Sequence, residues 1–408
     1  MQTRAPFALL GLIIAASSTL IACGSDDVNP VPTPNEDVLL DPPPEGKGVQ
    51  YQMTTKLEPG TEVEHCKFVQ APAEGMYVNR DEVRFTQGSH HFLLYETPYT
   101  TIPTKGEDGA AIDTSGVFDC SAGATQNFQV TKLIAGSQNA DGDAFLSFPS
   151  DVAMPVEPGR VLLMNAHYIN ATAGVLEPEV RVNLHTIPKE QVKEEGDILF
   201  WYNAFIKVGA KSTGRANMKC QIQDDITLMN VQSHMHARGT GYEAKIVGSE
   251  PFYTNPKWED VPVKSFDGGM KIAAGTWIDY RCDYNNAAAS DVFQGPRSTD
   301  EMCMLIGSYY PASPGTSNCA ADPAAPGQTG NLGAEWVGNG TKTCAATMGC
   351  VQQAVTGSGE VFQNITTCMM DSDPAVSKEM SDALRCFFLN GANAQTVCKI
   401  QFDACLAK

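Results

Sequence analysis

Two histidines separated by a single residue, His234 and His236, follow an apolar run at 226–231 that predicts a β-strand. On a strand, residues i and i+2 point to the same face, so the two imidazoles can share one metal ion. Taken alone, the pair is explained equally well by two surface histidines. The sequence has only 7 histidines, however, and most of them stand in compact local patterns. This concentration favours a metal site.

Three further histidines and one methionine are weaker candidates when each is taken alone. His90 and His91 are adjacent, so on a regular strand their side chains would point to opposite faces, and both reach one ion only where the backbone is distorted. A structural role is the favoured interpretation of this pair and of the single histidine His167. Met302 lies in an apolar run, where methionine usually fills a core. As a ligand, its thioether would favour copper, especially Cu(I).

Short apolar runs, broken by Gly, Pro, Asp and Asn, predict strands through most of the chain. The clearest runs lie at 92–95, 160–164, 179–184, 226–231 and 242–247. The pattern has the same character on both sides of residue 197. We therefore expect a mainly β protein with two consecutive antiparallel β-sandwich, jelly-roll-like domains.

The last part of the chain differs, because a helical period of 3.6 residues appears only there. Ser377–Leu389 and Gln395–Lys408 are predicted helices, and the first should end at a C-cap formed by Asn390 and Gly391. The stretch is rich in cysteine, which predicts a small disulfide-rich helical module but leaves the pairing open. Its cysteines are Cys344, Cys350, Cys368, Cys386, Cys398 and Cys405.

The N-terminus predicts an export signal. One positive charge, Arg4, precedes an apolar segment at 7–21 that is too short to span a bilayer comfortably. The segment runs into Leu20-Ile21-Ala22-Cys23, which resembles the bacterial lipobox and implies that Cys23 is lipidated. An ordinary secretory signal with an incidental cysteine is the alternative. The Pro- and Asp-rich stretch that follows is typical of an extended tether.

If the protein is exported, the other cysteines are expected to form disulfides. Removing Cys23 from the 13 leaves 12, an even number that favours up to six disulfides in an oxidising compartment. The net charge of −19 argues against a nucleic-acid partner, which would need a basic surface. We expect an exported protein, lipid-anchored at the bacterial cell envelope, at the outer membrane or the periplasmic face.

Taken together, these motifs resemble the copper type II, ascorbate-dependent monooxygenases. Members of that family include peptidylglycine alpha-hydroxylating monooxygenase and dopamine beta-monooxygenase. The resemblance covers roughly residues 60–320. It rests on the order and spacing of several short motifs, each of which is modest when taken alone. The matching pieces are His90-His91, His167-Tyr168, HxHxxG from His234 to Gly239, CxYN from Cys282 to Asn285, DEMC from Asp300 to Cys303, and Tyr309-Tyr310-Pro311.

The resemblance implies two sandwiches with one copper ion on each, facing a solvent-filled cleft. It implies that His90, His91 and His167 hold the electron-donating copper. It also implies that the copper at which oxygen reacts with the substrate is held by His234, His236 and Met302. Three disulfides are implied in the same way: Cys66 with Cys120, Cys220 with Cys319, and Cys282 with Cys303.

The expected organisation has five segments. They are a lipoprotein signal peptide at 1–22, a tether at 23–47, a sandwich with the first copper site at 48–196, a sandwich with the second at 197–330, and the helical module at 331–408.

Three substitutions depart from the family pattern. The peptidylglycine enzyme has an Arg two residues before the His-x-His motif and a Tyr four residues after the ligand Met, and both help to hold a peptide carboxylate. Here these positions are Gln232 and Ile306, and Met304 replaces an Asn. Without the Arg, charge-assisted capture of a carboxylate is lost. An amidating role is therefore not expected.

The leading hypothesis is a copper monooxygenase that hydroxylates a C–H bond of a small molecule or peptide. It would use O2 and electrons from ascorbate or another small reductant. An alternative is a surface lipoprotein that binds or stores copper on the same scaffold without turnover. A third interpretation is an adhesion or assembly lipoprotein. Storage, however, has no need for two unlike copper sites.

Overall fold

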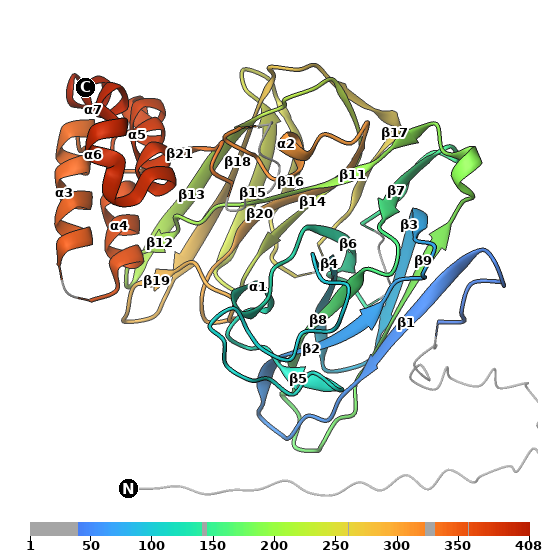
Figure 1. The fold of residues 1–408 in the computed structure, drawn as a ribbon. Helices are drawn as coiled ribbons and strands as arrows, with labels where there is room; N and C mark the ends of the chain where they lie inside the picture. Colours follow the sequence, from blue (N-terminus) through green and yellow to red (C-terminus); the bar gives the residue numbers. More distant parts are fainter. Residues whose placement is uncertain (1–39, 141–144, 260, 323–330, 358) are drawn as a thin grey trace, which may run out of the picture. The chain divides into compact units, whose positions relative to one another are not determined.

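The structure is a computed structural model that describes residues 40–140, 145–259, 261–322, 331–357 and 359–408, all within one compact unit (Figure 1). The expected signal peptide, the lipidation site Cys23 and the tether up to residue 39 lie outside the described residues. Within the described ranges, no helix has the length and apolar character needed to cross a membrane.

Residues 48–195 form two five-stranded sheets in the described part of the chain, ordered β1-β9-β3-β7-β10 and β5-β2-β8-β4-β6. Buried residues of both sheets join in one core, so we call this unit the first sandwich. All neighbouring strands are antiparallel except β7 and β10. The strands are β1 (Gly48–Thr54), β2 (Glu62–Gln70), β3 (Met76–Phe85), β4 (Ser89–Glu96), β5 (Val117–Asp119), β6 (Lys132–Ser137), β7 (Val152–Val156), β8 (Val161–Ile169), β9 (Glu179–Thr186) and β10 (Glu194–Glu195).

The alternating apolar pattern explains how these strands are placed. Val180, Val182 and Leu184 of β9 are fully buried, because alternate residues of a strand point to the same face and these point into the core. The strand predicted at 179–184 is therefore confirmed. The strand β8 is instead buried along almost its whole length. Both faces of its sheet are thus covered, which explains its continuous apolar sequence.

A second sandwich follows in the chain. In the described residues it has a four-stranded sheet, ordered β11-β20-β14-β17, and a five-stranded sheet, ordered β16-β15-β18-β13-β21, with the small β12-β19 pair beside them. The strands are β11 (Asp197–Tyr202), β12 (Lys207–Val208), β13 (Ser212–Gln221), β14 (Ile226–Met235), β15 (Gly239–Ile246), β16 (Pro251–Asn255), β17 (Lys264–Ile272), β18 (Trp277–Asn286), β19 (Val292–Phe293), β20 (Cys303–Tyr310) and β21 (Glu335–Val337). The expected fold class, mainly β with antiparallel sheets and a disulfide-rich helical module, is confirmed.

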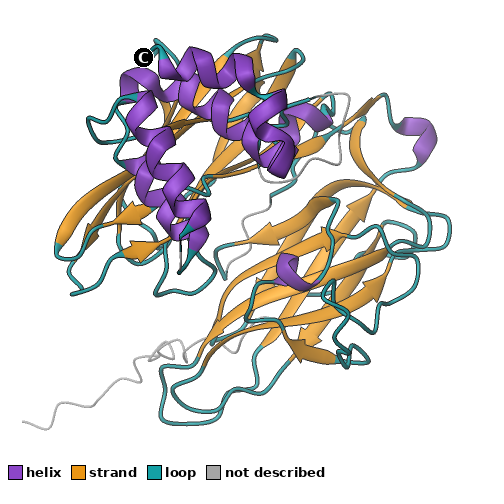
Figure 2. Ribbon diagram, turned by 60° about the vertical axis from the view of Figure 1, so that its left-hand side comes forward, coloured by secondary structure: helices purple, strands orange, loops and turns teal. Residues whose placement is uncertain are grey.

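Most of the helices gather in the C-terminal module, where α4 contacts β12 and β21, and α5 contacts β21 (Figure 2). The described α-helices are α1 (Ala124–Asn127), α2 (Pro314–Ser317), α3 (Cys344–Thr356), α4 (Val361–Met370), α5 (Ser377–Asn390), α6 (Ala394–Val397) and α7 (Lys399–Leu406). Short 3-10 turns occupy Lys189–Gln191, Pro374–Val376 and Gly391–Asn393. Disulfides Cys344–Cys405, Cys350–Cys368 and Cys386–Cys398 hold the module together.

Two helix predictions can be compared with the structure. The helix α5 ends at Asn390, and Gly391 takes a positive φ of 50° just after it, as the predicted C-cap requires. The continuous helix predicted at Gln395–Lys408 is wrong in one respect. The chain breaks at Cys398, which separates α6 from α7. Cys398 is tied back to Cys386 on α5, and this cross-link fixes the break.

The two sandwiches share apolar contacts through β20. Met304 and Ile306 are buried and pack in the core cluster of the first sandwich, together with Ile198 of β11. Met304 and Ile306 lie on β20, which pairs with β14, the strand that carries His234. Packing of the second sandwich onto the first therefore determines where the second sandwich's histidines lie.

Candidate metal centre

The first histidine set, His90, His91 and His167, lies on two neighbouring strands. His91 on β4 is directly paired with His167 on β8, and the pairing register shifts between Ser89 and His91. Because of this irregularity, His90 does not point away from the set. The ring centroids of the three histidines lie 5.1 to 5.5 Å apart. The backbone distortion that the adjacent pair requires is thus present.

The second ligand set, His234, His236 and Met302, lies where β14 and β20 meet. The rings of His234 and His236 are 5.2 Å apart at an interplanar angle of 86°. Met235 at the end of β14 is paired with Cys303 at the start of β20. In an antiparallel pair the next positions outward are His236 and Met302. The strand register therefore brings the histidine motif and the methionine to the same edge.

The two sets meet in one buried cluster. The ring of His91 lies 5.4 Å from that of His234, and the ring of Trp258, from the second sandwich, lies 5.6 Å from His90. His91, His167, His234 and His236 are all buried, at 2 to 8% exposure. In the part of the chain that the structure describes, the solvent-filled cleft implied between the two sets is therefore not seen. The sandwiches are docked, and side chains occupy the space between the sets.

Several ring nitrogens of the buried histidines lack a hydrogen-bond partner among the described residues. Among the described residues, Nδ1 of His91, Nδ1 of His167 and Nε2 of His236 have no hydrogen-bond partner. Leaving a buried polar atom unpaired costs about 1–3 kcal/mol, so such atoms call for an explanation. Neighbouring imidazoles that each keep a free nitrogen have the donor chemistry of a copper site.

The spacing of the rings also fits a shared ion. An imidazole nitrogen bound about 2 Å from an ion puts the centroids of two rings that share it about 5 Å apart. The spacings within the first histidine set and between His234 and His236 are close to that value. No three His, Cys, Asp or Glu side chains of the described ranges already converge in metal-coordinating geometry.

The protonation state of the histidines suits a metal. Burial, together with the neighbouring imidazoles, holds the pKa of His91 and His234 well below the ordinary value. Burial also lowers the pKa of His167, and it lowers the pKa of His236 to about 4. These four rings are neutral at neutral pH, and only a neutral imidazole offers a lone pair to a metal ion.

In three of the histidines, one ring nitrogen makes a hydrogen bond that orients the ring. His236 Nδ1 lies 3.2 Å from the carbonyl oxygen of Asp300, and His167 Nε2 lies 3.0 Å from Glu62 Oε1. His234 Nδ1 lies 2.6 Å from Gln138 Oε1. Such partners fix which nitrogen carries the proton and leave the other for the metal. Sequence reasoning missed Glu62 and Gln138, because neither belongs to a motif.

Glu301 braces the turn that follows the histidine motif. Its fully buried carboxylate accepts the backbone N–H of His236 at 3.1 Å and of Arg238 at 2.9 Å. The Arg238 guanidinium lies 3.9 Å away, and burial raises the pKa of the Glu301 carboxyl to about 7. Met302 is the next residue in the chain. The Glu301 side chain therefore connects the backbone at His236 and Arg238 to the segment that carries Met302.

We expect Glu301→Gln to lower both stability and copper affinity at the second ligand set. The amide offers only one acceptor oxygen, so one of the two backbone N–H groups loses its partner at a cost of about 1–3 kcal/mol. Thermal unfolding and a Cu(I) competition titration measure the two effects. Glu335→Gln is the matched control. Glu335 is bonded to Lys219 and Ser377 near the helical module, so its loss should lower stability alone. Equal copper affinity in the two variants would contradict the bracing role.

Disulfides hold the elements that carry the site. The structure pairs Cys66 with Cys120, Cys220 with Cys319 and Cys282 with Cys303, as the resemblance implies. The last bond joins β18 to the residue immediately after Met302. Tyr284, two residues along β18, donates a hydrogen bond of 2.8 Å to the carbonyl oxygen of Met302. The backbone of Met302 is thus fixed from two directions.

The other two histidines lie outside the cluster. His65 Nδ1 lies 2.7 Å from the hydroxyl of Thr55, and His185 Nε2 lies 3.3 Å from a Glu82 carboxylate oxygen. Each is engaged by a side chain of the first sandwich.

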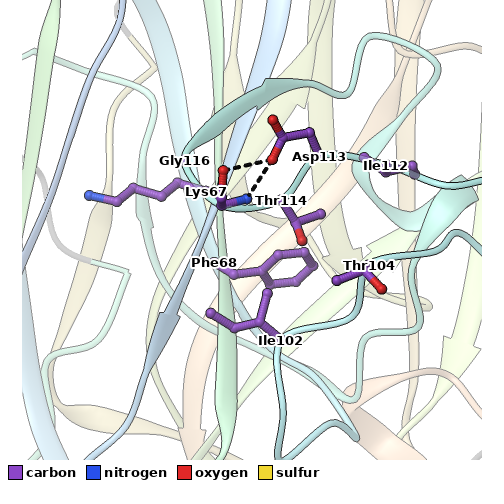
Figure 3. Close-up of a pocket in the computed structure, with 9 residues that line it drawn as sticks. Lys67, Phe68, Ile102, Thr104, Ile112, Asp113, Thr114 and Gly116 are labelled. Atoms are coloured by element: carbon purple, nitrogen blue, oxygen red, sulfur yellow. Dashed lines mark hydrogen bonds between the residues drawn. The ribbon is translucent and has the colours of Figure 1, made fainter.

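A surface hollow of about 330 Å³ also lies on the first sandwich (Figure 3). Phe68, Ile102 and Ile112 give it an apolar lining, and Asp113 at its rim accepts hydrogen bonds from the backbone N–H and hydroxyl of Ser115. None of the histidines is among its lining residues. The hollow is therefore distinct from the candidate metal centre.

Two solved structures show a distant likeness to this chain. The major capsid protein P2 from bacteriophage PM2 is 9% identical, over 63% of this chain and 97% of that chain, with a TM-score of 0.23. A structure of the infectious bursal disease virus Gt strain is 10% identical, over 69% of this chain and 76% of that chain, with a TM-score of 0.12. Scores this low carry no argument about fold or function. No curated protein matches the sequence.

A family model matches the second sandwich. Its description is "Copper type II ascorbate-dependent monooxygenase, C-terminal domain", and the match covers residues 207–325. This range includes His234, His236 and Met302, which the fold brings to one edge of the second sandwich. This part of the chain is thus similar to the C-terminal domain of the copper type II ascorbate-dependent monooxygenases.

Proposed function

We propose that this protein is a copper-dependent monooxygenase that hydroxylates a C–H bond of an organic substrate. The observation that carries the proposal is the cluster of buried, neutral histidines with unpaired nitrogens, contributed by two unlike ligand sets. The family match over 207–325 supports it. In the overall reaction, the substrate, O2, two electrons and two protons give the alcohol and water.

Each ligand set has a distinct part in this proposal. Copper bound by imidazoles alone cycles between Cu(II) and Cu(I), whereas a thioether ligand favours Cu(I), the form that reacts with oxygen. His90, His91 and His167 would hold the ion that receives electrons from the reductant. His234, His236 and Met302 would hold the ion next to the substrate. The protein buries four of these rings, those of His91, His167, His234 and His236, and keeps them neutral.

The substrate would not be captured through a carboxylate. Gln232 is 1% exposed, and its side-chain oxygen accepts a hydrogen bond from Gln138. Met304 and Ile306 are buried against the first sandwich. None of the three carries a positive charge, so charge-assisted binding of a carboxylate has no donor at these positions. We infer a substrate other than a peptide with a free C-terminus.

The proposal includes the place where the enzyme works. The lipobox-like sequence before Cys23 favours a lipid-anchored protein at the bacterial cell envelope, held by the Pro-rich tether. We propose the two sandwiches at 48–196 and 197–330 as the catalytic unit and 331–408 as an accessory module, which also contributes the strand β21 to the second sandwich. Ascorbate or another small one-electron donor would supply the electrons there.

Metal analysis of the purified mature protein tests the proposal first. We expect about two copper ions per chain, and oxygen uptake that starts only when a reductant is added. Untargeted analysis of the products should then find a hydroxylated compound. Full copper loading with no oxygen uptake across many donors would favour the copper-storage alternative. A folded protein that binds no copper would contradict both.

A further inference from the structure

Gln138 of the first sandwich reaches across to the second ligand set. It directly follows β6, and its side-chain Oε1 lies 2.6 Å from Nδ1 of His234. Its Nε2 donates to the carbonyl oxygen of Ser233 and to Oε1 of Gln232, both at 2.8 Å. One side chain from the first sandwich is therefore bonded to His234 and to the two residues before it, Gln232 and Ser233.

These contacts determine the tautomer of His234. The carbonyl oxygen of Ser233 can only accept, so the Gln138 atom facing it is the amide nitrogen. The Gln138 atom facing His234 is then the oxygen, and Nδ1 of His234 must donate the proton. The ring's Nε2 is left with its lone pair. An acceptor on one ring nitrogen is what prepares the other to bind a metal.

Glu62 makes a second bridge of the same kind. Its Oε1 accepts hydrogen bonds from Nε2 of His167 at 3.0 Å and from the backbone N–H of Ser298 at 2.8 Å. Its Oε2 accepts the hydroxyl of Ser298, also at 2.8 Å. Ser298 belongs to the second sandwich and lies four residues before Met302. One carboxylate therefore orients a ligand of the first set and holds the segment that leads to the second.

We propose that Gln138 and Glu62 are positioning residues through which the first sandwich completes the second metal site. The second ion then binds with full affinity only while the two sandwiches are docked. The inference rests on the proposed function and adds to it a structural role for the first sandwich, besides its own ion. The Gln138 contacts and the bond from His167 to Glu62 are partly buried, whereas the bonds from Ser298 to Glu62 are exposed.

The test is a Cu(I) titration of the full-length protein against a chromophoric Cu(I) chelator. Gln138→Met removes the acceptor while keeping the side-chain length, and it should weaken the second site about 10- to 100-fold without changing the first. Glu62→Met should weaken both sites, because Glu62 is bonded to His167 and to Ser298, which lies on the segment that leads to Met302. Glu62→Gln, which keeps an oxygen acceptor, should restore part of the loss.

Two matched controls use similar side chains within the first sandwich. Gln70 donates to the carbonyl oxygens of Thr100 and Gly159, and Glu107 accepts from Tyr99 and Gln129. Gln70→Met and Glu107→Met should leave both copper affinities unchanged. Thermal unfolding of each variant shows that a loss of affinity does not arise from a loss of fold.

The tautomer of His234 gives a readout independent of affinity and activity. In metal-free protein labelled with ¹⁵N-histidine, His234 should show a protonated Nδ1, and Gln138→Met should abolish this fixed tautomer. Gln138→Glu keeps the acceptor oxygen and should retain it. Unchanged affinity and tautomer in Gln138→Met, with two ions bound by the unaltered protein, would overturn this inference alone. An unaltered protein that binds no Cu(I) would overturn the proposed function as well.

Discussion

Met302→Ile should reduce reductant-driven hydroxylation at least about 100-fold, because it removes the thioether without changing the size of the side chain greatly. The first histidine set does not include Met302 and should still bind one ion. Copper content should therefore fall from about two ions to about one per chain. Inductively coupled plasma analysis and an oxygen electrode measure the two effects on the same preparation.

Met229→Ile is the matched control for this change. Met229 lies on β14, five residues before His234, and packs partly buried against the core of the first sandwich. The same substitution there should cost less than about 1.5 kcal/mol and leave both copper content and hydroxylation unchanged. If Met302→Ile kept full hydroxylation, the assignment of the oxygen-reacting site to His234, His236 and Met302 would be wrong.

Removal of the Cys282–Cys303 disulfide should have the second largest effect. The two cysteines are 21 residues apart in the sequence. Replacing both with alanine (Cys282→Ala with Cys303→Ala) should therefore lower the free energy of unfolding by about 3 kcal/mol. It should also lower copper affinity at the second ligand set, because Cys303 follows Met302 and is paired with Met235. Chemical denaturation and the Cu(I) titration report the two losses separately.

The helical module offers a control disulfide of similar span. Cys350 and Cys368 are 18 residues apart and join α3 to α4. Replacing both with alanine should lower stability by a similar amount while the copper affinities stay as they were. Equal losses of copper in the two double variants would show that the effect follows from lower stability rather than from bracing of Met302.

The sequence predicted much of this architecture, because each strand carries its own local pattern. The alternation at 179–184 and the apolar runs at 92–95 and 226–231 all became strands. The break at Cys398 was not predictable, because it depends on a cross-link to Cys386, and local periodicity says nothing about pairing. The helix α3 was not predicted either. Its small and polar residues give a weak apolar face.

The candidate ligands were found from sequence, but their surroundings were not. Motif order singled out His90, His91, His167, His234 and His236 because each sits in a short recognisable pattern. The contact between His91 and His234 depends on the docking of two sandwiches, which no local pattern encodes. Gln138 and Glu62 are single polar residues whose partners lie about a hundred or more positions away in most cases. Only the folded chain makes them relevant.

The burial of the disulfides bears on which reductants the proposed reaction could use. A thiolate breaks a disulfide only if it can approach one sulfur in line with the bond. Cys66, Cys120, Cys282 and Cys303 are at most 1% exposed, so such an approach is blocked in the folded state. Electrons, by contrast, need no such access to a sulfur atom. In the proposed reaction, a small one-electron donor could therefore reduce the copper ions while these cross-links remain oxidised.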